Sequence, residues 1–156
     1  MTKNISAIGA VSSAKPMEFM TIHRRDLLPD DVEMDILFCG ICHSDLHQIK
    51  NDFGASNYPM VPGHEIVGRV TAIGSAVTDF KVGDYAAVGC IVDSCGHCPA
   101  CERDMQQFCE EGTSLSFNTP DKHLGGMTYG GFSKTYVCKD KYMLHMPNGM
   151  DLAAGA

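Results

Sequence analysis

The chain has 156 residues, and 12 Lys and Arg against 19 Asp and Glu give it a formal net charge of −7. This acid excess argues against a nucleic-acid partner, because proteins that bind phosphate backbones carry clustered Lys and Arg. A hydrophobic fraction of 44% and a charged fraction of 20% are typical of a globular chain rather than a disordered one. We expect one domain, residues 1–156, with its own hydrophobic core.

No apolar segment reaches the roughly 18 to 20 residues that a membrane helix needs. Residues 1–13 also lack the continuous apolar run of about 7 to 15 residues found in a secretory signal. We therefore expect a cytoplasmic protein that has no membrane partner.

Short segments rich in β-branched and aromatic residues, separated by glycine and proline, predict a mostly β domain resembling a small barrel. Helices are expected only over residues 44–50 and 100–109. An α/β domain is disfavoured because it would need long amphipathic helices between the strands. In chain order, the predicted strands cover residues 5–11, 18–23, 32–39, 65–73, 85–90, 132–137 and 142–146.

Four of the eight cysteines lie within fifteen positions, with the spacing C-x₂-C-x₂-C-x₇-C. Two-residue spacers allow thiolates to converge on one tetrahedral ion, and four sulfur ligands leave no position for water. Disulfides are disfavoured because cysteine makes up only about 5% of a chain without a signal sequence. Residues 93–111 are therefore expected to form a lobe around a structural zinc ion, with the ligands Cys95, Cys98, Cys101 and Cys109.

An iron–sulfur cluster is the chemical alternative for these cysteines, because a similar spacing holds [4Fe–4S] clusters. Cys109 is followed by Glu110 rather than by the proline of ferredoxin motifs, so zinc is favoured. His97 lies inside the loop and is expected to face solvent, since four cysteines already complete the coordination sphere.

A second group of metal-type residues is separated along the chain. Cys42 precedes a predicted helix, and His64 and Glu65 precede a predicted strand. A single histidine before a strand is more often a hydrogen-bonded turn residue than a ligand. Together, the three residues could supply ligands to a zinc ion that keeps an open position.

The segment Gly-His-Glu-Ile-Val-Gly at residues 63–68 resembles the signature of the zinc-containing alcohol dehydrogenases, the medium-chain dehydrogenase/reductase family. The Cys-His-Ser-Asp block at residues 42–45, the four-cysteine lobe and the turn at residues 81–84 follow in that family's order. Residues 57–65 are similar to the cinnamyl-alcohol-dehydrogenase and aldehyde-reductase branch. The resemblance covers nearly the whole chain and implies a GroES-like, partly open β-barrel with few short helices and a Cys₄ zinc lobe.

The resemblance also implies a catalytic zinc ion. Cys42 and His64 would hold it, and Glu65 could enter the coordination sphere when water or substrate leaves. Asp45 matches the carboxylate that fixes the tautomer of the histidine ligand, a role that zinc-bound histidine generally requires.

The resemblance assigns further roles to neighbouring residues. Ser44 would hydrogen-bond the substrate oxygen, and His47, on the same helical face, would be the outer end of a proton relay. His43 would contact the cofactor pyrophosphate, and Cys90 would line the substrate pocket. The implied reaction is hydride transfer between a nicotinamide, NADP in this branch, and a small aldehyde or primary alcohol.

Members of this family also contain a nicotinamide-binding Rossmann domain and a third zinc ligand, a cysteine, farther along the chain. No two glycines of this sequence lie two positions apart, so these 156 residues contain no G-x-G-x-x-G fingerprint. We expect the catalytic domain of an enzyme that is a homo-oligomer in full-length form, and we expect this part alone to be inactive. The alternatives are a stand-alone, non-catalytic zinc-binding module and a zinc-ribbon-like interaction or nucleic-acid protein, which the charge disfavours.

Overall fold

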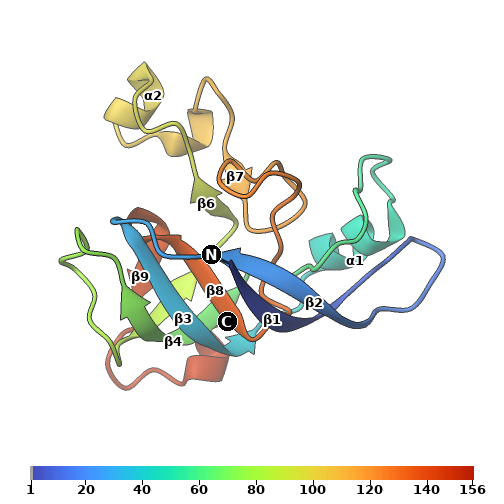
Figure 1. Ribbon diagram of the computed structural model, residues 1–156, viewed down its shortest axis with the longest axis horizontal. Coiled ribbons are helices and arrows are strands. Elements are labelled where there is room, and N and C mark those ends of the chain that lie inside the picture. Colours follow the sequence, from blue (N-terminus) through green and yellow to red (C-terminus); the bar gives the residue numbers. More distant parts are fainter. Residues whose placement is uncertain (1) are drawn as a thin grey trace.

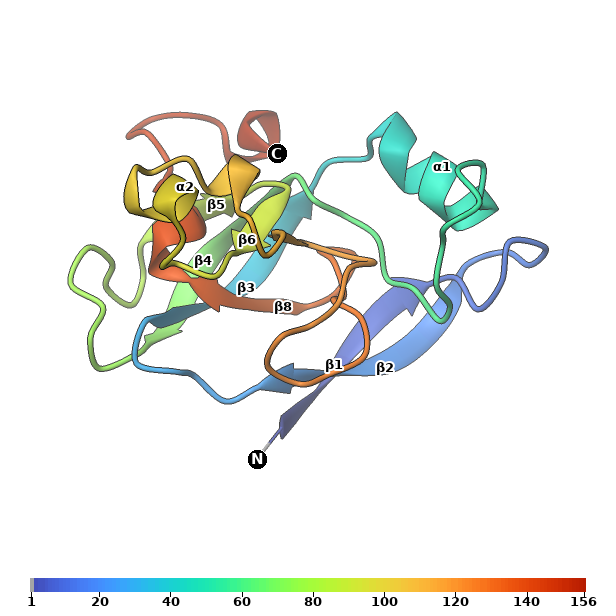
Figure 2. The same ribbon diagram turned by 90° about the horizontal axis from the view of Figure 1, so that it is seen from above.

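The computed structural model describes residues 2–156, which form short strands with little helix, as Figures 1 and 2 show. In chain order the elements are β1 (Thr2–Gly9), β2 (Glu18–Arg25), β3 (Asp31–Cys39), α1 (His43–Lys50), β4 (Ile66–Ile73), β5 (Tyr85–Val88), β6 (Ile91–Asp93), α2 (Pro99–Glu102), the 3₁₀ helix η1 (Gln106–Phe108), β7 (Ser114–Leu115), β8 (Thr135–Lys139), η2 (Asp140–Tyr142), β9 (Met143–His145) and η3 (Leu152–Gly155). Within residues 2–156, no helix is both long and apolar enough to cross a bilayer.

The main sheet is antiparallel and has the strand order β8-β3-β4-β5-β9. β3 lies between β4 and β8, and its pairing with β4 shifts register at Glu33/Met34 and again at Ile36/Phe38. Such irregularities bend a strand and increase its twist, so the sheet curls into a half-barrel. The prediction of a mostly β, partly open barrel is confirmed.

The hydrophobic core lies on one face of this curled sheet. Val32 and Met34, two positions apart on β3, are completely buried, as the alternation of side chains along a strand requires. Aliphatic residues of β4 and β5 complete the layer, among them Ile66, Val70, Ala86 and Val88.

The hairpin of β1 and β2 forms a separate sheet, and Arg24 joins it to the segment before β8 and to the first residue of β8. The buried guanidinium of Arg24 donates to the carbonyl oxygens of Tyr129, Gly130 and Thr135 at 2.6, 2.9 and 3.1 Å. It also lies 4.5 Å from the ring centroid of Tyr136. The side chain thus supplies donors to three buried or partly buried backbone acceptors.

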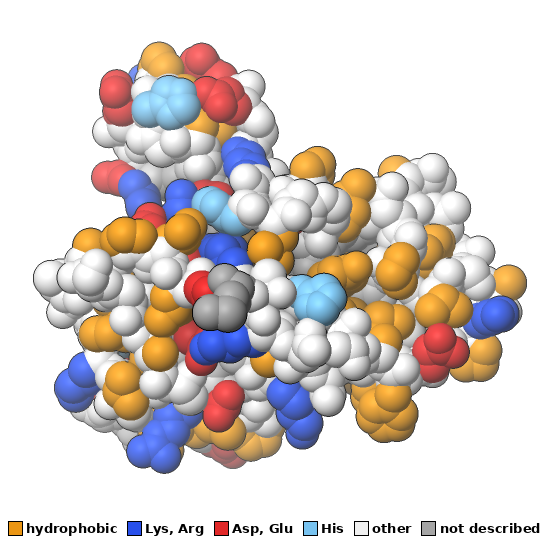
Figure 3. Space-filling view, in the orientation of Figure 1, with side chains coloured by type: hydrophobic (Ala, Val, Ile, Leu, Met, Phe, Trp, Pro, Cys, Tyr) orange, Lys and Arg blue, Asp and Glu red, His pale blue; other side chains and the backbone are white. Residues whose placement is uncertain are grey.

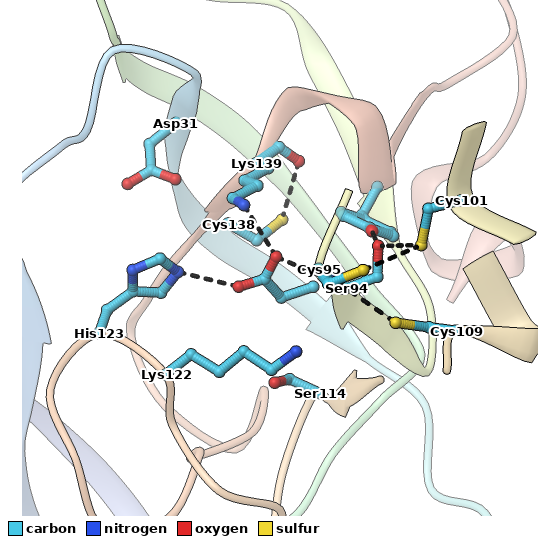
Figure 4. Close-up of polar contacts among 12 residues, drawn as sticks. Asp31, Ser94, Cys95, Cys101, Cys109, Ser114, Lys122, His123, Cys138 and Lys139 are labelled. Carbon is cyan, nitrogen blue, oxygen red and sulfur yellow. Dashed lines mark hydrogen bonds and ion pairs between the residues drawn. The ribbon is translucent and has the colours of Figure 1, made fainter. Parts of the chain in front are cut away.

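A lobe built from β6, α2, η1 and β7 projects from the sheet (Figure 1). Asp93, the last residue of β6, is buried at its base and lies 2.9 Å from Lys139 of β8 and 2.9 Å from His123. Figure 4 shows Lys139 and His123 approaching the same carboxylate beside Ser94. Although burial alone would raise the pKa of Asp93, the ion pair with Lys139 and the hydrogen bonds from His123 and the backbone of Ser94 together outweigh it and lower that pKa.

Several predicted boundaries were wrong. Residues 100–109 form two short helices rather than one, because Asp104 has a φ of +56° and turns the chain. The strand predicted over residues 132–137 begins only at Thr135, since Gly130, Gly131 and Phe132 instead donate to the carbonyls of residues 61–63. The short strands β6 and β7 were not predicted.

We expect Arg24→Met to lower the free energy of unfolding by about 2–4 kcal/mol, because the carbonyl oxygen of Tyr129 loses its guanidinium donor and those of Gly130 and Thr135 keep only the hydroxyl of Ser133. Arg69→Met, which changes an exposed arginine of β4, is the matched control and should cost less than about 0.5 kcal/mol. Urea denaturation measures both. Equal losses in the two variants would contradict the anchoring role of Arg24.

Candidate metal centres

Two separated segments meet at the first candidate centre. Cys42 is the N-cap of α1, and His64 and Glu65 lie immediately before β4. One potential ligand atom from each of these three residues lies within 4.8 Å of the other two. Cys42 is half-buried, His64 is buried and Glu65 is exposed, so the group opens to one side. The structure therefore brings together the three residues that the sequence proposed for a zinc ion with an open position.

The buried carboxylate of Asp45 joins the two segments that carry this group. One oxygen, Oδ2, accepts a hydrogen bond from the backbone amide of Cys42 at 2.9 Å. The other, Oδ1, accepts from the amide of Gly63 at 2.9 Å and lies 3.1 Å from Nδ1 of His64. Asp45 is completely buried. Because Nδ1 faces this carboxylate, it carries the proton and Nε2 presents its lone pair.

Ser44 lies among the ligand atoms. Its hydroxyl donates to Sγ of Cys42 at 3.1 Å and lies 3.3 Å from Nε2 of His64. This hydrogen bond lowers the pKa of Cys42 below its ordinary value. A lower pKa favours the thiolate, which is the form that binds metal.

Two residues at this centre were not found from the sequence. The ring of buried Phe117 stacks on His64, with the ring centroids 5.8 Å apart. At Gly40, a Cβ atom would lie 2.6 Å from Oε2 of Glu65, so glycine leaves room for this carboxylate. A single phenylalanine and a single glycine have no spacing that marks a site, so neither had a signal in the sequence.

Cys90 follows β5 and is exposed. Partial burial, followed by the negative charges of Cys42, Glu65 and Asp45, raises the pKa of its thiol. The role of Cys90 on the wall of a substrate pocket stays a prediction.

His43 and His47 lie on α1, which ends at Lys50 because Asn51 adopts a left-handed φ of +59°. Nδ1 of His47 lies 2.8 Å from the carboxylate of Asp52, and both side chains are exposed. The rings of His43 and His47 are 5.8 Å apart. Their roles in cofactor binding and proton relay stay predictions.

The second candidate centre lies in the projecting lobe, where the four predicted cysteines converge. The sulfur atoms of Cys95, Cys98, Cys101 and Cys109 all lie within 4.8 Å of one another, and none forms a disulfide. Cys98 and Cys101 are buried, whereas Cys95 and Cys109 are half-buried. This arrangement suits a tetrahedral ion with no open position.

Backbone amides point at the sulfur atoms of this cage. The amide of Cys98 donates to Sγ of Cys95 at 3.3 Å, and that of Glu110 donates to Sγ of Cys98 at 3.5 Å. The hydrogen bond from Glu110 is the largest contribution that lowers the pKa of Cys98. Such amides stabilise thiolates, so the donor set of this structure fits a zinc ion.

Ser94 connects the cage with the barrel. Its hydroxyl lies 3.3 Å from Sγ of Cys101 and accepts a hydrogen bond from the hydroxyl of Tyr142 at 2.6 Å. Figure 4 shows Ser94 between the cage and the carboxylate that Lys139 and His123 approach. His97 is exposed, as the sequence predicted.

Comparison with known proteins yields consistent matches. Residues 28–148 match the family described as "Alcohol dehydrogenase GroES-like domain". The chain is 45% identical to NADP-dependent alcohol dehydrogenase C of Mycobacterium bovis over 97% of its own length and 44% of that protein's. It is 46% identical to aldehyde reductase YahK of Escherichia coli over 91% of its own length and 40% of that protein's.

The solved structure of a cinnamyl alcohol dehydrogenase from Sorghum bicolor superposes with a TM-score of 0.92 at 39% identity, covering 96% of this chain and 42% of that one. The branch of the family to which the sequence was compared is thereby confirmed. The chain spans less than half the length of these relatives.

We expect Asp45→Asn to weaken zinc binding at the Cys42–His64 centre by about 10- to 100-fold, because the amide cannot accept from all three of its present partners. Chelator competition measures the affinity. Asp52→Asn, an exposed acid beyond the same helix, should leave it unchanged. Unaltered zinc affinity in Asp45→Asn would contradict the role of this carboxylate.

Cys101→Ser should remove the zinc ion of the lobe and expose residues 95–109 to protease, because a neutral hydroxyl replaces a buried thiolate ligand. Cys138→Ser changes a buried cysteine of β8 and should retain that zinc. Elemental analysis and limited proteolysis check both variants. Equal zinc contents would rule out the cage.

Proposed function

We propose, since this chain belongs to the family of alcohol dehydrogenases with a GroES-like domain, that it is the catalytic-domain portion of a zinc-dependent alcohol dehydrogenase or aldehyde reductase. Its substrates would be small aldehydes and primary alcohols. The observation that carries the proposal is the convergence of Cys42, His64 and Glu65 above the buried carboxylate of Asp45. The domain would comprise residues 1–156, with a structural zinc lobe at residues 93–111.

The proposed cofactors are zinc at both centres and NADP. The preference for NADP rests on a relative that is named for its dependence on NADP. The nicotinamide and the third protein ligand of the catalytic zinc would come from a part of the enzyme outside these residues. In its full-length form we expect the enzyme to be a homo-oligomer, which sedimentation equilibrium would measure.

Substrate would bind on the open side of the Cys42–His64 centre. When bound, the zinc ion supplies a Lewis acid that polarises the substrate carbonyl. Ser44 already lies between Sγ of Cys42 and Nε2 of His64, so its hydroxyl is placed to donate a hydrogen bond to the substrate oxygen. Asp45 keeps the proton of His64 on Nδ1 throughout, and stacked Phe117 excludes water from one side of the imidazole.

Proton transfer to the product oxygen would pass through Ser44 and His47. Position 47 follows position 44 on the same face of α1. Asp52 holds Nδ1 of the exposed His47, which leaves Nε2 to exchange a proton with solvent. His43, on the same helix, would contact the cofactor pyrophosphate.

A chimera tests this proposal. Residues 1–156 are joined to the downstream portion of the Mycobacterium bovis relative, and oxidation of NADPH by an aromatic aldehyde is followed at the nicotinamide absorbance. We expect turnover by the chimera and none by residues 1–156 alone. A chimera that folds, binds zinc and NADPH and does not reduce aldehyde would instead support a non-catalytic zinc-binding module.

In an active chimera, Ser44→Ala should lower kcat by about 100-fold or more, because the proton donor at the substrate oxygen is lost. Ser75→Ala, an exposed serine after β4, is the matched control and should retain full activity. An unchanged kcat in Ser44→Ala would remove Ser44 from the mechanism.

A further inference from the structure

We propose that Cys95, His97 and Glu111 form a zinc access site, through which the metal enters and leaves the four-cysteine cage. The inference rests on the zinc ion proposed for that cage. It assigns a function to a histidine and an acid that neither the cage nor the catalytic centre uses.

The access site has its own ligand geometry. One potential ligand atom from each of Cys95, His97 and Glu111 lies within 4.8 Å of the other two. Nε2 of His97 is 2.7 Å from Oε1 of Glu111, and the two side chains are 71% and 56% exposed. Sγ of Cys95 therefore belongs both to the cage and to a solvent-facing group of donors.

The burial of the cage leaves one direction for an incoming ion. Cys98 and Cys101 are only 6% and 2% exposed, and Ser94 covers Cys101 on the side of the barrel. Cys95 and Cys109 are half-buried, so the cage opens beside them. Figure 3 shows histidine and acidic side chains gathered on the tip of the projecting lobe.

The backbone places His97 for this role. Gly96 has a φ of +80°, which returns the chain so that Nδ1 of His97 lies 2.9 Å from the carbonyl oxygen of Cys95. This contact orients the ring, and Nε2 faces Glu111. Because Glu111 follows Cys109 by two residues, the access site connects the two half-buried ends of the cage motif.

The order of ligand strengths would move zinc inward. Nε2 of His97, which faces the carboxylate of Glu111, would release its proton to solvent as a hydrated zinc ion exchanges water molecules for that nitrogen and for the carboxylate oxygen. The ion would then exchange a further water molecule for the shared thiolate. Thiolates are the softer ligands and zinc prefers a site with four of them, so transfer from the access site into the cage is favourable. The reverse sequence would return zinc to solvent without oxidation or reduction.

A purely structural role for the same pair predicts a different result. Exposed ion pairs in general contribute little to stability. If the His97–Glu111 pair acts only by holding the lobe together, its loss would loosen the lobe and speed the release of zinc. Loss of an access site slows entry and release together and leaves the affinity unchanged, because it alters only the path.

Isotope exchange separates these possibilities. Protein carrying Cys42→Ala, so that cage zinc alone is counted, is mixed with excess zinc enriched in another isotope, and bound isotopes are followed by mass spectrometry. His97→Asn and Glu111→Gln should each lower the rate at which added zinc replaces the bound zinc by at least about tenfold. The amount of zinc bound in the cage should stay the same. Glu110→Gln and His23→Asn are the matched controls and should exchange at the parent rate.

Unaltered exchange in His97→Asn, with one zinc ion per chain, would overturn the access site and leave the cage standing. Faster release would also overturn it, in favour of a structural ion pair. Absence of zinc in the parent cage would overturn the proposed cage itself. If Cys42→Ala fails to fold, His64→Ala provides the same background.

Discussion

The first candidate centre depends on one buried carboxylate. Asp45 accepts from the backbone of Cys42 at the start of α1 and from Gly63 in the segment before β4, and it also contacts His64. A completely buried carboxylate is stable only when such donors surround it, so each of these contacts constrains the other two. The distance between Cys42 and His64, two of the potential metal ligands, is therefore set by Asp45, which is not itself one of the proposed ligands.

The two candidate centres differ because their surroundings differ. At the cage, four sulfur atoms and inward-pointing amides enclose one position, and Asp93, Lys139 and Ser94 connect that enclosure with the barrel. At Cys42 and His64, an exposed glutamate and the hydroxyl of Ser44 border an open side. A closed coordination sphere suits a structural ion and an open one suits catalysis, so this single small domain offers one candidate site of each kind.

Local patterns predicted much of this architecture. The strands at residues 18–23, 32–39 and 65–73 were close to β2, β3 and β4 because alternation and β-branched residues are read within a few positions. Helix α1 was predicted to within one residue. The predictions failed where long-range contacts decide: residues 130–132 bond to residues 61–63 rather than continue a strand, and the lobe helix breaks at Asp104.

The sequence by itself determined which residues are proposed to carry the chemistry, because the cysteine spacing and the blocks at residues 42–45 and 63–68 are contiguous and chemically specific. Only the tertiary structure decided how those blocks face each other. It placed Phe117 on His64 and left room for Glu65 at Gly40. The physical reason is distance along the chain: these contacts depend on how the sheet curls and how buried groups are satisfied, and no short segment encodes either.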